Sequence, residues 1–222
     1  MVMARVEPRF VVAFGAGSAA AATLATAFPV LVWPAVAFAV VGAAYAGVGP
    51  RPFAKSASGA LHPVSTAVLA PYLALAWLVL LGLRLRDEAG YHEVRPRLFV
   101  GRRPLRASEL PKEVSLIVDL TSEFPGVRPK GVEYICLPTL DGSAPNDVEA
   151  VRALVERIRR HDGVVYVHCA AGHGRSVAIV ASVLVAEGRA NDVESAMAII
   201  RSVRPHVGLS RSQRALVRAC AA

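Results

Sequence analysis

The stretch "HCAAGHGRS", from His168 to Ser176, places a cysteine and an arginine six positions apart in a chain of 222 residues. The residues before it, "GVVYV", are rich in β-branched side chains and predict a short buried strand. Those after it, "SVAIVASVLVAEG", are long enough for a helix and end at Gly188, a common helix-stop residue. The stretch is therefore expected to form the loop of a strand–helix corner.

A loop of this kind is suited to binding an anion. N–H groups at a helix start point the same way and attract phosphate, and Gly172 and Gly174 allow a tight turn. The same field favours the thiolate form of Cys169, and Arg175 offers a planar fork that matches two phosphate oxygens. The alternative is a buried structural cysteine that happens to precede a helix.

The fuller pattern "VHCAAGHGRS", Cys-x5-Arg-Ser after a strand, resembles the protein tyrosine phosphatase superfamily in its compact dual-specificity branch. The resemblance covers residues from about 91 to 222. It implies an α/β fold with a central, mostly parallel sheet flanked by helices, and it implies no cofactor. A metal site at His168, Cys169 and His173 is not expected, because zinc usually takes three or four protein ligands and no matching pair occurs elsewhere.

The resemblance also implies a role for each motif residue. Cys169 would attack phosphorus and form a phosphocysteine, Arg175 would hold the phosphoryl oxygens, and Ser176 would bond the sulfur and ease its departure. His168 would orient the loop through backbone hydrogen bonds. The remaining loop residues would bind phosphate: Ala170, Ala171, Gly172, His173 and Gly174.

An alcohol leaving group needs a proton, and Asp141 in "LPTLDGSAPND" is the candidate general acid. It follows a strand end and lies 28 residues before the cysteine, about where the family places its acid. Asp119, Asp147 and Asp162 are the alternatives, each better explained as structural, helix-capping or turn residues. Gln213 resembles a glutamine of the family and is expected to be structural.

The remaining pattern predicts alternating strands and helices, hence a mostly parallel sheet with helices on both faces and a ligand at the carboxyl ends of the strands. Asn146 and Asn191 are each followed at the third position by glutamate, as in a capping box. The expected strands are 97–101, 114–121 and 133–138, and the expected helices are 146–161, 191–204 and 210–222.

The first 86 residues have a different character. No charged residue occurs from Phe10 to Pro50 or from Pro63 to Leu83, and a membrane span needs about 20 apolar residues. We expect a membrane region, 1–86, with spans at about 10–28, 30–48 and 63–83, followed by a phosphatase domain, 87–222. Signal-peptide cleavage near Ala27 and a hairpin that does not fully cross are the alternatives.

Three spans put the two termini on opposite sides of the membrane. Basic residues then lie on both sides, so the positive-inside rule favours neither orientation. We expect the phosphatase domain in the cytoplasm, because a reactive thiolate survives best in a reducing compartment. The basic residues that flank the spans are Arg5, Arg9, Arg51, Lys55, Arg84 and Arg86.

The net charge of +8 does not indicate nucleic-acid binding, because aromatic and basic residues are not interleaved and no zinc-finger or RNP pattern occurs. A basic domain beside a membrane is expected to favour anionic lipids. Three widely spaced cysteines make no disulfide framework, and we expect Cys136 to be a core residue and Cys220 to be inert.

Substrate class is the remaining question. Family members that act on polyphosphoinositides tend to carry lysines in the loop, and this loop has none. The sequence therefore favours a membrane-anchored phosphatase acting on protein phosphotyrosine in the dual-specificity manner. A phospholipid monoester such as phosphatidylglycerophosphate is the second interpretation, and a non-catalytic, membrane-tethered phosphate-binding module is the third.

Overall fold

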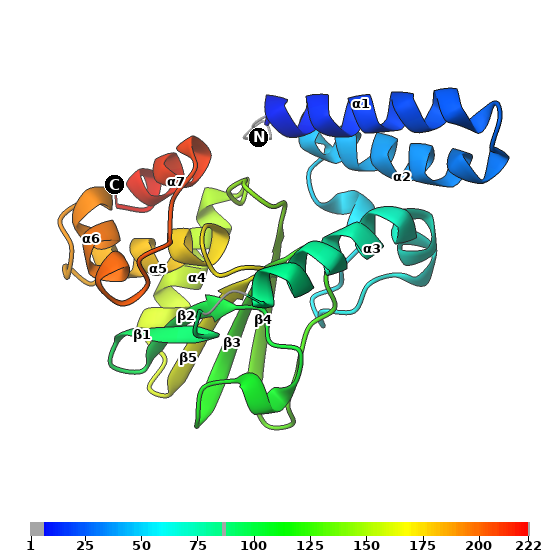
Figure 1. The fold of residues 1–222 in the computed structure, drawn as a ribbon. Helices are drawn as coiled ribbons and strands as arrows, with labels where there is room; N and C mark the ends of the chain where they lie inside the picture. Colours follow the sequence, from blue (N-terminus) through cyan, green and yellow to red (C-terminus); the bar gives the residue numbers. More distant parts are fainter. Residues whose placement is uncertain (1–6, 86–87, 222) are drawn as a thin grey trace.

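The computed structural model describes residues 7–85 and 88–221 (Figure 1). One sheet has the strand order β1-β2-β5-β3-β4, and only the β1–β2 pair is antiparallel. Because β5 lies between two parallel neighbours, its last residue, Cys169, stands at the carboxyl edge of the sheet. The strands are β1 (Tyr91–Arg95), β2 (Leu98–Arg102), β3 (Val114–Thr121), β4 (Glu133–Thr139) and β5 (Val164–Cys169).

The helices that follow pack on one face of the sheet. They are α4 (Val148–Arg159), α5 (Arg175–Ala186), α6 (Val193–Val203) and α7 (Arg211–Ala221). Val165 and Val167 of β5 join the apolar core of these helices, while Tyr166 points to the other face and packs with Leu110. On that second face, Leu110 of the β2–β3 connection, which carries the 3-10 turn η4 (Ala107–Glu109), packs with Ile117 and Tyr166.

Two local predictions from the sequence need correction. The first concerns β1, which the pattern missed because "YHEVR" carries charge and lies half-exposed at the sheet edge. The second concerns the caps of α4 and α6. Asp147 and Asp192 cap these helices in place of Asn146 and Asn191, because a carboxylate accepts the free N–H groups and also suits the positive end of the helix.

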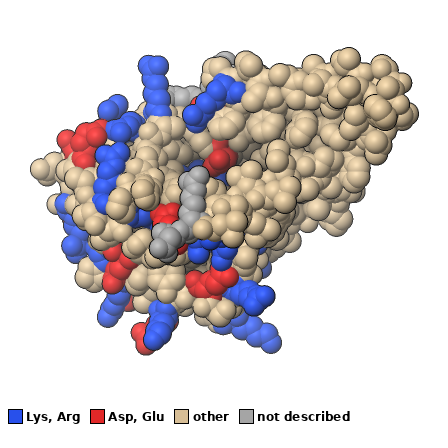
Figure 2. Space-filling model, in the orientation of Figure 1, with Lys and Arg blue, Asp and Glu red and all other residues tan. Residues whose placement is uncertain are grey.

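The membrane region forms three helical segments that are long and apolar enough to cross a bilayer. They are α1 (Pro8–Ala25), a second segment made of η1 (Pro29–Leu31), α2 (Val32–Ala43) and η2 (Ala44–Val48), and α3 (Pro63–Arg84), preceded by the short turn η3 (Arg51–Phe53). Aromatic rings join them: Phe14 stacks on Tyr45 and meets Tyr72 edge to face. On the face drawn in Figure 2, charged side chains gather on the phosphatase part and are nearly absent from the far part of these helices.

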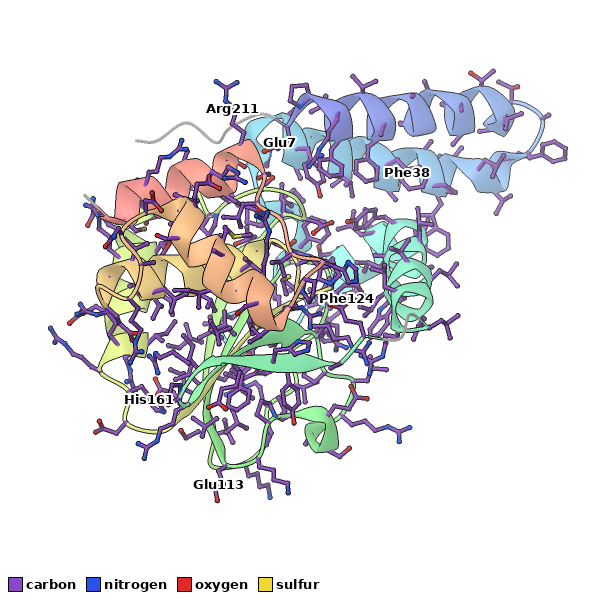
Figure 3. All side chains as sticks on the ribbon, turned by 60° about the vertical axis from the view of Figure 1, so that its left-hand side comes forward. Glu7, Phe38, Glu113, Phe124, His161 and Arg211 are labelled. Atoms are coloured by element: carbon purple, nitrogen blue, oxygen red, sulfur yellow. The ribbon has the colours of Figure 1, made fainter. Side chains whose placement is uncertain are left out.

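The membrane region packs directly on the phosphatase domain. Lys55, in the loop before α3, reaches Asp119 at the end of β3, and the ring of Trp77 on α3 meets the edge of Phe124. Figure 3 places Phe124 between the sheet and α3. The boundary predicted at residues 86 and 87 lies outside the described residues, but the two predicted domains share a continuous interface.

The Lys55 contact generates a stability prediction. The ammonium lies 2.8 Å from the Asp119 carboxylate and donates to Thr121, and both charged side chains are fully buried. Lys55→Met leaves a buried carboxylate without its cation, which costs about 3–5 kcal/mol. Thermal unfolding in detergent should show the loss, and adding Asp119→Asn should recover part of it. The exposed pair of Arg152 and Glu149 is the control, and Arg152→Met should change little. Equal stability of wild type and Lys55→Met would contradict this account.

Candidate active site

The loop after β5 is built around the sulfur of Cys169. This side chain is 3% exposed. Its Sγ accepts the backbone N–H of Gly172 at 3.3 Å and lies 3.4 Å from the Oγ of Ser176. The structure thus brings Ser176 to the cysteine, as the sequence predicts. Both groups therefore lie against the sulfur that is expected to attack phosphorus.

Gly172 is the residue that permits this bend. Its φ of +76° lies in the left-handed region, and a Cβ there would stand 2.3 Å from the carbonyl carbon of Gly101 on β2. Any other residue would push the loop away from the strand beside it. At the second glycine, Gly174, a Cβ would stand 3.2 Å from the side chain of Gln213, whose amide donates to the Ser143 carbonyl at 2.9 Å. Gln213 therefore holds the loop that carries Asp141 against the start of α7.

Arg204 is a buried arginine that the sequence analysis did not identify, and it binds the backbone carbonyl groups of the loop. Arg204 donates to the carbonyl oxygens of Gly172 at 3.0 Å and Ala171 at 3.1 Å. It also forms an ion pair with Glu88 at 3.0 Å, and Glu88 in turn bonds the ring of His173. With these carbonyl groups tied to Arg204, the N–H of Gly172 is directed at the sulfur. The ring of His173 is engaged with Glu88, so its part in the loop is through its backbone.

The guanidinium of Arg175 is buried at the same edge. Two of its nitrogens bond the carboxylate of Glu123 at 2.8 and 3.0 Å, and it also donates to the Thr139 carbonyl. Burial lowers the pKa of Arg175, but the carboxylates of Glu123 and Asp141 outweigh burial and raise the pKa well above its usual value. Its Nε is buried and has no hydrogen-bond partner among the described residues.

Glu123 is the second residue that sequence reasoning missed. It follows β3 directly and is 4% exposed. Burial raises the pKa of Glu123, but Arg175 and the hydrogen bonds from the backbone and Ser122 together lower it below its usual value. The only sequence signal is an acidic residue just past a buried strand, at the edge where the carboxyl ends of parallel strands meet.

Asp141, the predicted general acid, lies beside Arg175. Its carboxylate is 3.1 Å from Arg175, its side chain is 64% exposed, and its carbonyl accepts the hydroxyl of Tyr45 from the membrane region. The alternatives are placed elsewhere. Asp119 is buried and bound to Lys55, Asp147 caps α4, and Asp162 precedes β5 at the opposite edge of the sheet.

His168 packs as a neutral ring. Burial lowers its pKa to about 4, and the ring stacks on Tyr166. Neither ring nitrogen makes a hydrogen bond of good geometry among the described residues, although the backbone of Cys169 lies close enough to raise the pKa of the ring slightly against burial. No group of three His, Cys, Asp or Glu side chains close enough to hold a metal ion occurs in residues 7–85 and 88–221.

The remaining cysteines lie apart from this loop. Cys136 on β4 and Cys220 on α7 are both free thiols. Both are only partly buried, whereas Cys136 was expected in the core. Burial raises the pKa of each thiol. Raised pKa values keep both thiols protonated at neutral pH, in contrast to the environment of a nucleophile.

A buried cysteine at the head of an anion-binding loop, with a buried arginine across from it, defines a cysteine-dependent phosphatase fold. A family model described as "Dual specificity phosphatase, catalytic domain" matches residues 104–219, and the chain belongs to this family. Its catalytic domain is thus of the phosphoric monoester hydrolase type. The expected superfamily and α/β fold are confirmed.

Curated relatives have lipid-phosphatase names. The chain is 35% identical over 85 residues to phosphatidylglycerophosphate phosphatase PTPMT1 of Arabidopsis thaliana, covering 37% of this chain and 25% of that protein. It is 34% identical over 89 residues to PTPMT2 of the same plant, 39% of each protein. The chain therefore spans less than half of these relatives. The solved structure "PTPMT1 in complex with PI(5)P" matches with a TM-score of 0.52 at 23% identity, over 60% of this chain and 94% of that one, which shows the fold.

The geometry predicts the behaviour of the nucleophile. Cys169→Ser replaces the thiolate by a hydroxyl that stays protonated at neutral pH, while the loop donors and Arg175 remain in place. Turnover of p-nitrophenyl phosphate should fall to background, and calorimetry should still detect phosphate binding. Turnover at the wild-type rate would rule out the covalent route.

The position of Asp141 predicts a dependence on the leaving group. Asp141→Asn removes the proton donor, so alkyl phosphates with poor leaving groups should slow by about 10²–10⁴-fold. p-Nitrophenyl phosphate, whose leaving group needs little protonation, should slow much less. Asp147→Asn is the matched control, because that side chain caps α4. Equal slowing of all substrates by Asp141→Asn would show that another group supplies the proton.

Proposed function

We propose that the protein is a membrane-bound phosphatase that hydrolyses the phosphomonoester of a glycerophospholipid. The observation that carries the proposal is the position of the loop beneath the membrane helices. Tyr45 of η2 bonds the backbone of Asp141, and Trp77 of α3 covers Phe124 and Arg103 beside the loop. A lipid headgroup lies beside such helices without leaving the bilayer.

The side chains of the loop account for both chemical steps. The thiolate of Cys169 attacks phosphorus, the bond to the lipid oxygen breaks, and Asp141 gives that oxygen its proton. Arg175 and the loop N–H groups hold the three non-bridging oxygens as their charge shifts. Water then attacks the phosphocysteine, Asp141 takes a proton from the water, and Ser176 stabilises the departing thiolate. Inorganic phosphate and a lipid alcohol are the products.

The loop has no lysine for additional phosphates, so a lipid substrate is expected to carry a single phosphate. Two features favour such a lipid over the phosphotyrosine substrate expected from the sequence. The apolar helices α1 and α3 line the same pocket as Asp141, so a substrate that enters from a bilayer can reach the loop along them. The curated relatives are named as phosphatases of phosphatidylglycerophosphate, and this supports the same substrate class here.

A side-by-side rate comparison tests the proposal. The full chain in detergent micelles should hydrolyse phosphatidylglycerophosphate with a much higher kcat/KM than phosphotyrosine peptides, and Cys169→Ser should remove both activities. Vanadate should inhibit and EDTA should not, because no described cluster of residues fits a metal. Faster hydrolysis of the peptides than of the lipid would restore protein phosphotyrosine as the substrate.

We also propose a topology of two membrane crossings, where the sequence suggested three. Both flanks of α3 contact the phosphatase domain: Gly59 accepts a bond from Gly126 at 2.9 Å, and Arg84 pairs with Glu109 at 2.5 Å. Helix α3 therefore runs along the domain. The start of α1 is also on this side, because Glu7 accepts the hydroxyl of Ser212.

In this arrangement α1 and α2 form a hairpin that crosses and returns, while α3 packs against α2, with Trp33 donating to the Ala67 and Val68 carbonyls, and does not cross. The described basic flanks Arg9, Arg51, Lys55 and Arg84 then share one side, and the turn at 26–28 carries no charge. With the basic residues on one side, the positive-inside rule favours a cytoplasmic phosphatase domain.

Cysteine labelling separates the two topologies. In a chain whose native cysteines are replaced, Ala27→Cys should react with an impermeant maleimide from outside intact cells, and Ala57→Cys should react only after lysis. Both positions are exposed in the structure. Three crossings with a cytoplasmic domain predict the reverse pattern, so one experiment decides.

A further inference from the structure

One pocket joins the phosphate loop to the membrane helices. Its cavity volume is about 210 Å³, and its polar lining residues are Glu123 and Asp141, beside Ala170 and Ala171 of the loop. Its apolar walls come from α1, η2 and α3, chiefly Phe10, Phe14, Tyr45, Tyr72, Val79 and Leu83. The reacting end and the apolar walls therefore belong to a single continuous space.

The pocket is accessible from the bilayer side of α3. Val79 lines it and is 55% exposed, and Leu75, one turn earlier, also lines it and is 45% exposed. Both belong to the apolar face of α3 that the phosphatase domain leaves uncovered. A molecule that fills the pocket needs a phosphate at one end and hydrocarbon at the other, and it can enter directly from the lipid.

We propose that this pocket is an acyl-chain subsite that holds the glycerol end and first chain carbons of the phospholipid monoester. The inference rests on the proposed function and assigns the membrane helices a part in substrate recognition besides anchoring. Hydrocarbon leaving the bilayer for this pocket stays among apolar side chains, so no apolar surface enters water as the phosphate reaches Arg175. A peptide would place polar backbone against the same walls, which costs free energy.

A pair of neighbouring substitutions tests the subsite. Val79→Trp fills the pocket, while Leu78→Trp adds the same side chain at a 67% exposed position outside the pocket lining. In mixed micelles, Val79→Trp should raise KM for long-chain phosphatidylglycerophosphate roughly tenfold or more. It should leave p-nitrophenyl phosphate hydrolysis within about twofold of wild type. Leu78→Trp should change neither. An unchanged lipid KM in Val79→Trp, with the wild type active on lipid, would overturn the subsite alone.

Crosslinking provides a readout that does not depend on the activity of a pocket variant. The full-length Cys169→Ser chain is mixed with phosphatidylglycerophosphate carrying a diazirine near the start of one acyl chain. Crosslinks should concentrate on 72–83 and on Phe10 and Phe14, and unlabelled substrate should compete with them. Crosslinks that are spread over the outer helix surfaces and that unlabelled substrate does not reduce would refute the acyl-chain subsite. A wild-type chain inactive on lipid but active on phosphopeptides would overturn the proposed function together with the subsite.

Discussion

The buried pairing of Arg175 with Glu123 is the interaction on which the site depends. It joins the first residue of α5 to the segment after β3, and the same guanidinium reaches the end of β4 and the carboxylate of Asp141. Several elements thus meet at one charged group. A guanidinium removed from water destabilises the fold unless its donors find partners. Of the nitrogens of Arg175, only Nε lacks a partner among the described residues, and we expect this N–H to donate to the bound phosphate. Stability and anion affinity are therefore set by the same side chain.

The motif and its setting were predictable because their signals are local. The β-branched run, the glycines and the apolar helix are contiguous, so the strand–loop–helix corner and the positions of Cys169, Arg175 and Ser176 follow from neighbouring residues. Asp141 was predictable from its place after a strand. Glu123, Arg204 and Lys55 were not, because each acts through a partner far away in the chain and no periodicity marks it.

The number of membrane crossings was also not predictable from local sequence. Length and hydropathy identify helices able to span a bilayer, but they do not say where the connecting loops go. The loop before α3 turns back onto the phosphatase domain through Lys55 and Gly59. Only this tertiary contact changes the expected number of crossings, and with it the side on which the basic residues lie. The cap residues were predicted one position too early for a smaller reason: at the start of α4 and of α6 an asparagine and an aspartate are adjacent, and both are good N-caps.

The insertion of Lys55 into the domain has a consequence for which forms of the chain are stable. The lysine belongs to the membrane region, yet it neutralises a carboxylate in the interior of the catalytic fold. A fragment that lacks the membrane region keeps that carboxylate and loses its cation. We expect such a fragment to be less stable than the full chain and to be removed sooner by cellular proteolysis. The lysine would in this way make the stability of the catalytic fold depend on the presence of the N-terminal segment.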